Sequence, residues 1–318
     1  MEKILNEAML KGVNDIYISP TKEEKYVIKF HVNGKLKISK YVENTNVQRL
    51  IASIKYRAHM DIAEKRRPQI GRFIFGKIWI RVSTVGDFLN RETVVLRFIY
   101  TNQQQQNWVD DGQFKQLRAA IPNSELFVIA GPTGSGKTST LYRLLNNIAA
   151  EKLVLTIEDP VEIQQHQFIQ LQVNTSAQMD YDALIKVALR HRPEVLLVGE
   201  IRDTATAKAT IRAALSGHLV FSTVHAMSAR DVVLRLLDLG IKSEQLKLAL
   251  GGVVYQRLIT TISGTQAALI DYLSEGLIKR IIAGESVEKF SNMWRETLQY
   301  ALKHNIISKA VYETYKAI

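Results

Sequence analysis

The chain contains no cysteine, which excludes disulfide bonds and thiolate metal sites. No apolar run approaches the roughly 18 residues that a membrane-spanning helix needs. The segment Met1–Glu7 lacks the apolar core of a secretory signal peptide, and we therefore expect a cytoplasmic protein. With 46% hydrophobic residues over 318 positions, the chain can build the cores of two ordinary domains, and wholesale disorder is excluded.

Acidic residues are fewer than basic ones, which gives the chain a formal net charge of +11. Such an excess attracts polyanions, whether nucleotides, nucleic acid or an anionic membrane face, or it serves only to keep the surface soluble. The basic residues are scattered, and no basic stripe with interleaved aromatic residues is present. Direct binding of nucleic acid is therefore not expected from charge alone.

The most informative stretch is residues 131–138, which match the phosphate-loop motif G-x-x-x-x-G-K-[ST] without a mismatch. The apolar segment Leu126–Ala130 before it predicts a strand, and Ser139–Leu145 after it predicts a helix. Glycines let successive N–H groups point into one concavity, to which the helix adds its positive end. The alternative is a glycine-rich turn that binds nothing. We expect the following residues to hold a nucleotide: Gly131, Pro132, Thr133, Gly134, Ser135, Gly136, Lys137, Thr138 and Ser139.

Within this loop, Lys137 and Thr138 have distinct expected roles. The Lys137 ammonium can reach the β- and γ-phosphates, and the Thr138 hydroxyl can hold Mg²⁺. The chemistry implied is attack of water on the γ-phosphate, in which positioning and charge neutralisation do most of the work.

Apolar strands alternate with helices from about Gln113, a pattern that predicts a parallel α/β sheet. From Ser243 onward the chain is expected to be mostly helical. The predicted elements are strands at Leu126–Ala130, Leu153–Ile157, Val195–Val198 and Leu219–Ser222, and helices at Tyr181–His191 and Thr204–Leu215.

The first 100 residues predict a separate, smaller α+β domain. Two strand-like runs meet at Asn33-Gly34 and two more at Gly76-Lys77, which indicates two hairpins. Further elements are expected as helices at Glu2–Leu10 and Val47–Met60 and strands at Asp15–Ile18 and Thr93–Ile99. Residues 101–112 are polar at first and are interpreted as a linker to a domain at residues 113–318, although a surface loop within one domain would give a similar pattern.

Polar residues follow three of the predicted parallel strands, where ligands of such sheets bind. Glu158 and Asp159 follow the first: Glu158 would orient or deprotonate a water, and Asp159 would help to hold the metal. The alternative is two solvated carboxylates in a turn. Glu200 follows the second and is the main candidate for a carboxylate linked to the metal or to water. Arg202 and Asp203 are expected to form a local ion pair.

Two histidines, His218 and His225, flank the third strand. His225, at the exit of the strand, is the candidate for contacting the γ-phosphate, whereas His218 would anchor its loop. Two ligands are too few for a zinc site. The set still lacks an arginine to neutralise charge in the transition state. Arg81, Arg91 and Arg97, on or beside strands of the N-terminal domain, are candidates, or they are ordinary charges at strand edges.

Taken together, these motifs resemble the secretion (traffic) ATPases of type II secretion, type IV pili and DNA-uptake pseudopili. The matching segments follow one another in the order typical of that family, and they span most of the chain: Asn14–Pro20, Phe30–Gly34, Met60–Arg72, Arg81–Thr84, the phosphate loop, Glu158–Glu162, Glu200–Asp203 and the histidine segment ending at His225. Many members carry four zinc-binding cysteines, which this chain lacks. In this respect it most resembles the short assembly ATPases of Gram-positive competence pseudopili. Ile70 stands where the family usually has aspartate.

The resemblance implies a RecA-like phosphate-loop ATPase domain preceded by a PAS-like N-terminal domain, with ATP and Mg²⁺ as cofactors and no zinc. It implies a ring of six subunits in which nucleotide lies between the two domains, near Arg81, Arg91 and Arg97. It also implies a peripheral association with the inner face of the cell membrane, where the motor would move a platform protein. Two alternatives remain at this stage: a DNA-translocating motor and a non-enzymatic scaffold ordered by bound ATP.

Overall fold

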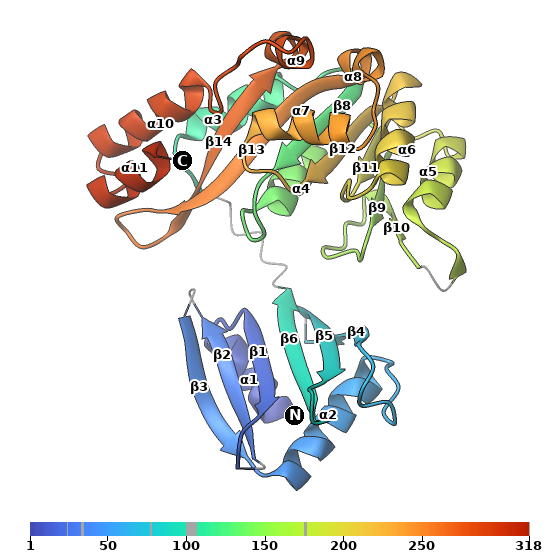
Figure 1. Ribbon diagram of the computed structural model, residues 1–318, viewed down its shortest axis with the longest axis vertical. Helices are drawn as coiled ribbons and strands as arrows, with labels where there is room; N and C mark the ends of the chain where they lie inside the picture. The colour runs from blue at the N-terminus through green and yellow to red at the C-terminus, as the bar shows by residue number, and fades with distance from the viewer. Residues whose placement is uncertain (24, 33–34, 77, 100–106, 175–176, 318) are drawn as a thin grey trace. The chain divides into compact units, whose positions relative to one another are not determined.

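The computed structural model describes residues 1–23, 25–32, 35–76, 78–99, 107–174 and 177–317. The chain divides into two compact units, residues 1–103 and 104–318 (Figure 1). Part of the predicted linker, residues 101–106, and the predicted turn residues Asn33, Gly34 and Lys77 lie outside the described residues. Residues 107–112, also assigned to the linker from the sequence, include a short strand and the start of a helix of the second unit.

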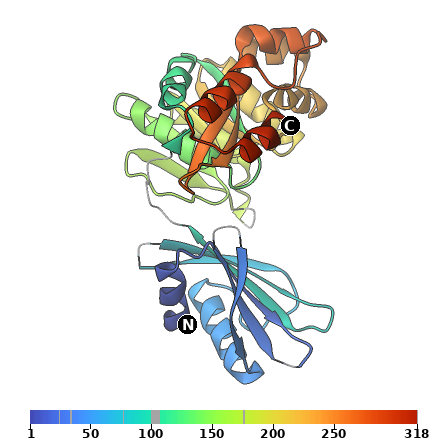
Figure 2. The same cartoon turned by 90° about the vertical axis from the view of Figure 1, so that its left-hand side faces the viewer.

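The N-terminal unit is a six-stranded antiparallel sheet with strand order β3-β2-β1-β6-β5-β4. Helices α1 and α2 pack against the same face of this sheet (Figure 2). Apolar residues alternate along the central strands, so that one face of the sheet joins the helices in a core. The elements are α1 (Glu2–Leu10), β1 (Asp15–Pro20), β2 (Tyr26–Val32), β3 (Lys35–Val42), α2 (Asn44–Arg57), β4 (Gln69–Phe75), β5 (Ile78–Gly86) and β6 (Glu92–Ile99).

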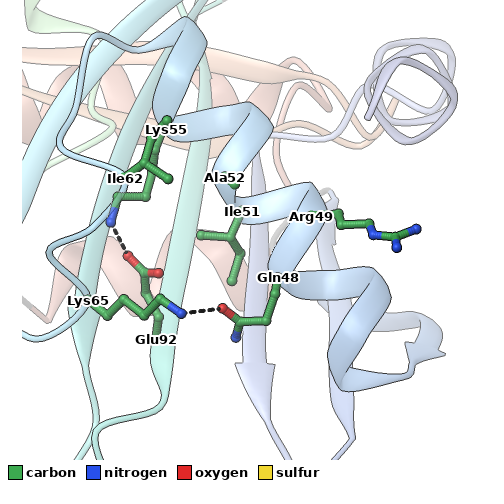
Figure 3. A pocket seen from close by; sticks show the side chains of 8 residues that line it. All are labelled: Gln48, Arg49, Ile51, Ala52, Lys55, Ile62, Lys65 and Glu92. Atoms are coloured by element: carbon green, nitrogen blue, oxygen red, sulfur yellow. Dashed lines mark hydrogen bonds and ion pairs between the residues drawn. The ribbon is translucent and has the colours of Figure 1, made fainter.

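A buried ion pair ties helix α2 to the sheet. The Lys55 side chain is fully buried, and its Nζ donates to Glu92 Oε1 at 2.7 Å and to the Glu64 carbonyl at 2.5 Å. Figure 3 shows this pair beside a cavity of about 280 Å³ that is also lined by Gln48, Ile51 and Lys65. The pair therefore holds three segments together: α2, the start of β6 and the chain that leads into β4.

The second unit is built on an eight-stranded sheet of order β10-β9-β11-β12-β8-β13-β14-β7, parallel from β10 to β13. Strand β14 runs antiparallel to β13. The strands are β7 (Asn107–Trp108), β8 (Glu125–Ala130), β9 (Val154–Glu158), β10 (Phe168–Gln172), β11 (Val195–Val198), β12 (Leu219–Val224), β13 (Leu250–Thr260) and β14 (Gln266–Ser274).

Helices cover both faces of this sheet. Leu141, Leu144 and Leu145 of α4 pack with Phe127 and Phe221 on one face, whereas helices α5 to α10 contribute to the core on the other. This explains why the central strands are apolar at nearly every position. The helices are α3 (Asp111–Ala119), α4 (Lys137–Ile148), α5 (Tyr181–Arg190), α6 (Thr204–Leu215), α7 (Ala229–Asp238), α8 (Ser243–Ala249), α9 (Glu275–Ile282), α10 (Asn292–Lys303) and α11 (Lys309–Lys316).

The architecture confirms the predicted fold class, an α/β domain with a RecA-like parallel sheet preceded by a smaller α+β domain. The prediction of a mostly helical segment from Ser243 is wrong for residues 250–274, which form the long antiparallel hairpin β13–β14. Strand β13 pairs with β8 on its other side, so tertiary pairing fixes its extended state. The segment is helical before this hairpin, in α8, and after it, in α9, α10 and α11.

Candidate nucleotide-binding site

The order of the strands brings the predicted site residues to one edge of the sheet. Strands β9, β11, β12 and β8 are neighbours in that order and run parallel. Their carboxyl ends carry, in the same order, Glu158, Glu200, His225 and the phosphate loop that begins at Gly131. Residues separated by almost a hundred positions in the sequence are thus gathered where ligands of parallel sheets bind.

The loop between β8 and α4 has the backbone that its glycines predict. Gly131, Gly134 and Gly136 have φ angles of +150°, +78° and +82°, which glycine adopts without strain. A Cβ atom on Gly131 would also lie only 2.3 Å from the carbonyl oxygen of Gln256 on β13. The loop is therefore closely seated on β13, and a side chain at residue 131 is excluded by sterics.

Helix α4 begins at Lys137 without a capping side chain and without an acidic residue in its first turn. Its first N–H groups are therefore left for an anionic ligand, which the positive end of the helix attracts. Thr138 and Ser139 lie in this first turn; Thr138 is half-buried and Ser139 is exposed. Ser135 is 3% exposed, and its Oγ has no hydrogen-bond partner.

The side chain of Lys137 folds back onto its own loop. Its Nζ donates to the carbonyl oxygens of Gly131 at 2.8 Å and Pro132 at 3.0 Å. Burial lowers the pKa of Lys137 from its usual value, and the negative charges of Glu200 and Glu162 oppose that shift. Two carboxylates therefore act electrostatically on the ammonium, one that follows β11 and one in the loop after β9.

Glu200 is held between an arginine and a histidine. Arg202 Nε donates to Glu200 Oε2 at 2.7 Å, and His225 Nε2 lies 3.1 Å from Glu200 Oε1. Strands β11 and β12 fix the backbone on both sides, because Thr223 Oγ1 donates to the Gly199 carbonyl and the Ile201 N–H donates to the Thr223 carbonyl. The carboxylate consequently has a defined position at the end of β11.

Glu158 has different surroundings from those expected. It is 6% exposed, and its carboxylate accepts hydrogen bonds from Tyr142 Oη at 2.7 and 2.8 Å, from Thr156 Oγ1 at 2.7 Å and from Gln170 Nε2 at 3.3 Å. Burial raises the pKa of Glu158, against the opposing effect of these donors. The donors come from α4, β9 and β10, so the carboxylate links these elements, and its lone pairs are engaged by protein groups. The catalytic role given to Glu158 stays a prediction, which these contacts do not favour.

Glu162 is the carboxylate to which the sequence analysis gave no individual role. It is half-buried and acts electrostatically on Lys137. Asp159 is exposed, and its Oδ2 lies 4.0 Å from Arg202 Nη1. The sequence shows Glu162 as the third acidic residue of the segment Glu158–Glu162. Spacing alone does not tell which of these carboxylates is buried against other side chains.

The structure also shows the contacts of Arg202, Asp203 and His218. The expected ion pair between Arg202 and Asp203 is wrong, because Arg202 pairs with Glu200 and Asp159. The Asp203 side chain instead accepts a hydrogen bond from Thr206 N and caps α6. This correction reflects the N-cap preference of aspartate. His218 Nδ1 lies 3.2 Å from the Ala213 carbonyl, in agreement with the expected role in anchoring its loop.

The three candidate arginines lie on or next to the sheet of the N-terminal unit. Arg81 and Arg97 are direct cross-strand neighbours on β5 and β6. Arg97 Nε donates to Asp15 Oδ1 at 2.7 Å. Arg91 precedes β6 and is held by Asp87 and by the Thr21 carbonyl. Arg91 and Arg97 are thus held within the N-terminal unit, and the phosphate contact of the three arginines stays a prediction.

The donors at this edge are compatible with Mg²⁺. Hydroxyl and carboxylate oxygens are its ligands, and it is usually held by one or two carboxylates together with phosphates. Thr138, Glu200 and Asp159 carry oxygens of these kinds, and their role as metal ligands stays a prediction. Within the described residues, no group of three or more His, Cys, Asp or Glu is placed to hold a metal ion by itself. The same residues contain no helix with the length and apolar character that crossing a membrane requires.

Comparisons with known proteins agree with this geometry. The competence protein ComGA of Streptococcus pneumoniae is 37% identical over 99% of this chain and 97% of its own length. The type IV pilus assembly ATPase TfpB of Acinetobacter baylyi is 36% identical over 81% of this chain, which spans 45% of that longer protein. The solved structure of the pilus retraction motor PilT with bound ADP matches 98% of this chain and 96% of its own with a TM-score of 0.77; at 23% identity this likeness shows the fold.

The family model for type II/IV secretion system proteins matches residues 1–298. The match covers both units, including the phosphate loop, Glu200 and His225. The chain therefore belongs to the type II/IV secretion system protein family.

Proposed function

We propose that this chain is a Mg²⁺-dependent ATPase that drives assembly of a pilus or pseudopilus for DNA uptake or protein secretion. The observation that carries the proposal is the single edge of the sheet where the phosphate loop with Lys137 lies beside the strand ends that carry Glu200 and His225. The names of relatives support the biological setting, since they include a competence protein and a type IV pilus assembly ATPase.

The phosphates bind to the N–H groups of the loop and of the first turn of α4. On binding, Lys137 exchanges its contacts with the Gly131 and Pro132 carbonyls for contacts with phosphate oxygens. Thr138 and Glu200, together with Asp159, would hold Mg²⁺, which would supply positive charge to offset that of the phosphates.

Water attacks the γ-phosphate and yields ADP and inorganic phosphate, while a carboxylate accepts the proton of the water. Glu200 and Glu162 both act electrostatically on Lys137 and are therefore the carboxylates that we assign to metal and water. Glu200 is already paired with Arg202 and His225, which keeps it in position. We assign the proton of the water to Glu162, which leaves Glu200 for the metal, and His225 would sense the γ-phosphate through Glu200.

Charge that develops in the transition state needs further positive groups. Arg81 and Arg97 supply them when the N-terminal unit meets a nucleotide in the assembled protein. Asp87 and the Thr21 carbonyl bind Arg91, and Asp15 binds Arg97, so both arginines also contribute to the fold of the N-terminal unit. Replacing Arg81 with alanine is expected to lower turnover, whereas replacing Arg91 is expected to lower the stability of the N-terminal unit.

The working assembly is a homohexameric ring associated peripherally with the cytoplasmic face of the membrane, where an inner-membrane platform protein receives its motion. Membership of the type II/IV secretion system protein family supports this arrangement. The prediction is that ATP promotes ring formation and that the ring binds the platform protein.

The test measures phosphate release and particle size for the wild type and for Glu200→Gln, with and without DNA. The wild type should hydrolyse Mg·ATP, and Glu200→Gln should bind ATP but hydrolyse it at least about a hundredfold more slowly. Ring formation without any turnover would favour the scaffold, and turnover that requires DNA would favour a translocase. Normal turnover by Glu200→Gln would discard the role of this carboxylate.

A further inference from the structure

Strand β13 reaches beyond its pairing with β8 and lies under the phosphate loop. Tyr255 pairs with Ala130, the last residue of β8. Gln256 is the next residue, and its carbonyl oxygen is so close to Gly131 that a Cβ there would lie 2.3 Å away. The first residue of the loop is thus pressed against β13, although the two segments are more than a hundred positions apart in the sequence.

The side chain of Gln256 joins two parts of the nucleotide site. It is fully buried, its Nε2 donates to the Ser135 carbonyl at 2.6 Å, and its Oε1 accepts from Thr140 Oγ1 at 2.8 Å. Because a carbonyl can only accept, the contact with Ser135 fixes the orientation of the amide. The side chain therefore bridges the middle of the loop and the second turn of α4.

The Ser135 carbonyl belongs to the same peptide unit as the N–H of Gly136. In a planar trans peptide, the C=O and the N–H point in opposite directions. Holding the carbonyl toward β13 therefore turns the Gly136 N–H away from β13, to the side on which a phosphate-loop cradle forms. Gly134 and Gly136, with φ angles of +78° and +82°, leave this peptide free to rotate if it is not anchored.

The other anchored carbonyls of the loop behave differently. Those of Gly131 and Pro132 accept from Lys137, whose ammonium must leave them to reach a phosphate. The contact from Gln256 comes from a different strand and does not compete with the nucleotide. It can persist through binding, hydrolysis and release.

We propose that Gln256 is a positioning residue that locks the Ser135–Gly136 peptide, so that the Gly136 N–H is presented to the phosphates of the nucleotide. This inference rests on the proposed function as a nucleotide-dependent enzyme. The same amide contact is made with substrate and product, so its loss should weaken binding of both and affect the chemical step much less.

The experiment compares Gln256→Met, which keeps the volume and removes both hydrogen bonds of the amide, with Thr140→Val, which removes the hydrogen bond to α4 but leaves the contact between Gln256 and Ser135. The affinity for Mg·ADP is measured by calorimetry, KM and kcat by phosphate release, and Tm without nucleotide. For Gln256→Met we expect Kd and KM to rise about tenfold and kcat to stay within about twofold. Thr140→Val should lower Tm comparably but keep Kd within about twofold of the wild type.

A second variant, Gln256→Glu, keeps an acceptor for Thr140 but presents an anion to the Ser135 carbonyl. It should lose at least as much affinity as Gln256→Met, and it keeps the test decisive if the methionine variant does not fold. Wild-type affinity in a folded Gln256→Met or Gln256→Glu protein would overturn the inference, as would an equal loss in Thr140→Val. Failure of the wild type to bind nucleotide would overturn the proposed function and this inference together. If the wild type binds nucleotide, the variants test the role of Gln256 alone.

Discussion

His225 Nε2 lies 3.1 Å from Glu200 Oε1, although the two residues are held by different parallel strands, β12 and β11. The histidine therefore acts on the carboxylate before any nucleotide is bound. We predict that His225→Ala lowers kcat about a hundredfold, because Glu200 loses one of its two positioning partners. Binding of Mg·ADP should change little. Steady-state kinetics and calorimetry measure the two effects separately.

The matched control for this prediction is His218→Ala at the opposite end of the same strand. His218 contacts the Ala213 carbonyl and lies away from the carboxylates. Its variant should keep the kcat of the wild type. Equal losses in both variants would show that the effect at His225 is a general disturbance of β12.

Glu162 and Glu158 offer a test of which carboxylate serves catalysis. Glu162 acts on Lys137, whereas Glu158 is engaged by Tyr142, Thr156 and Gln170. We expect Glu162→Gln to lower kcat at least about a hundredfold, since a neutral amide does not accept the proton of the attacking water. Glu158→Gln should keep kcat within about tenfold. The reverse order in single-turnover phosphate release would return Glu158 to the catalytic role predicted from the sequence.

The pH dependence of stability should report the buried state of Glu158. Burial raises its folded pKa above the usual value of 4.5, so the folded protein binds this proton more tightly than the unfolded chain does. The resulting contribution to the free energy of unfolding is fully present below pH 4.5 and is lost as the pH rises through the raised pKa. Glu158→Gln cannot ionise and should flatten this part of the curve. Urea unfolding at a series of pH values measures it, and an unchanged curve would count against the burial.

Breaking the buried ion pair between Lys55 and Glu92 should strongly destabilise the N-terminal unit. Replacing Lys55 with methionine leaves the Glu92 carboxylate, which is 2% exposed, without its partner. We expect a destabilisation of about 3–5 kcal/mol. Hydrogen exchange of peptides from β5 and β6 in the full chain measures it.

The double variant Lys55→Met/Glu92→Leu should recover most of that loss, because no unpaired charge remains. Lys11→Ala is the surface control: its partner Glu7 and Lys11 itself are both exposed, so the change should be below about 1 kcal/mol. A Lys55→Met effect as small as the control would contradict the importance of the buried pair.

Much of the fold could be predicted because its strands and helices have clear local patterns. Helices α1 and α6 have the predicted bounds, and the four strands that carry the site were predicted to within about three residues. The hairpin β13–β14 could not be recognised in the same way, because its extended state depends on pairing with β8. The role of Gln256 was missed with it.

The residues of the site could be predicted from the sequence, but the partners of their side chains could not. Polar residues at strand ends indicated Glu158, Glu200 and His225 because parallel strands share one edge. The pattern could not say that Glu158 is enclosed by Tyr142, or that Arg202 pairs with Glu200 and not with Asp203. Such choices depend on side-chain packing between elements far apart in the sequence.

The most direct measurement is phosphate release from Mg·ATP by the wild type and by Lys137→Ala. Turnover by the wild type and none by the variant is the predicted result, because the loop would lose the charge that reaches the phosphates. Equal turnover by both proteins would contradict the account, since hydrolysis would then take place without the central residue of the proposed site.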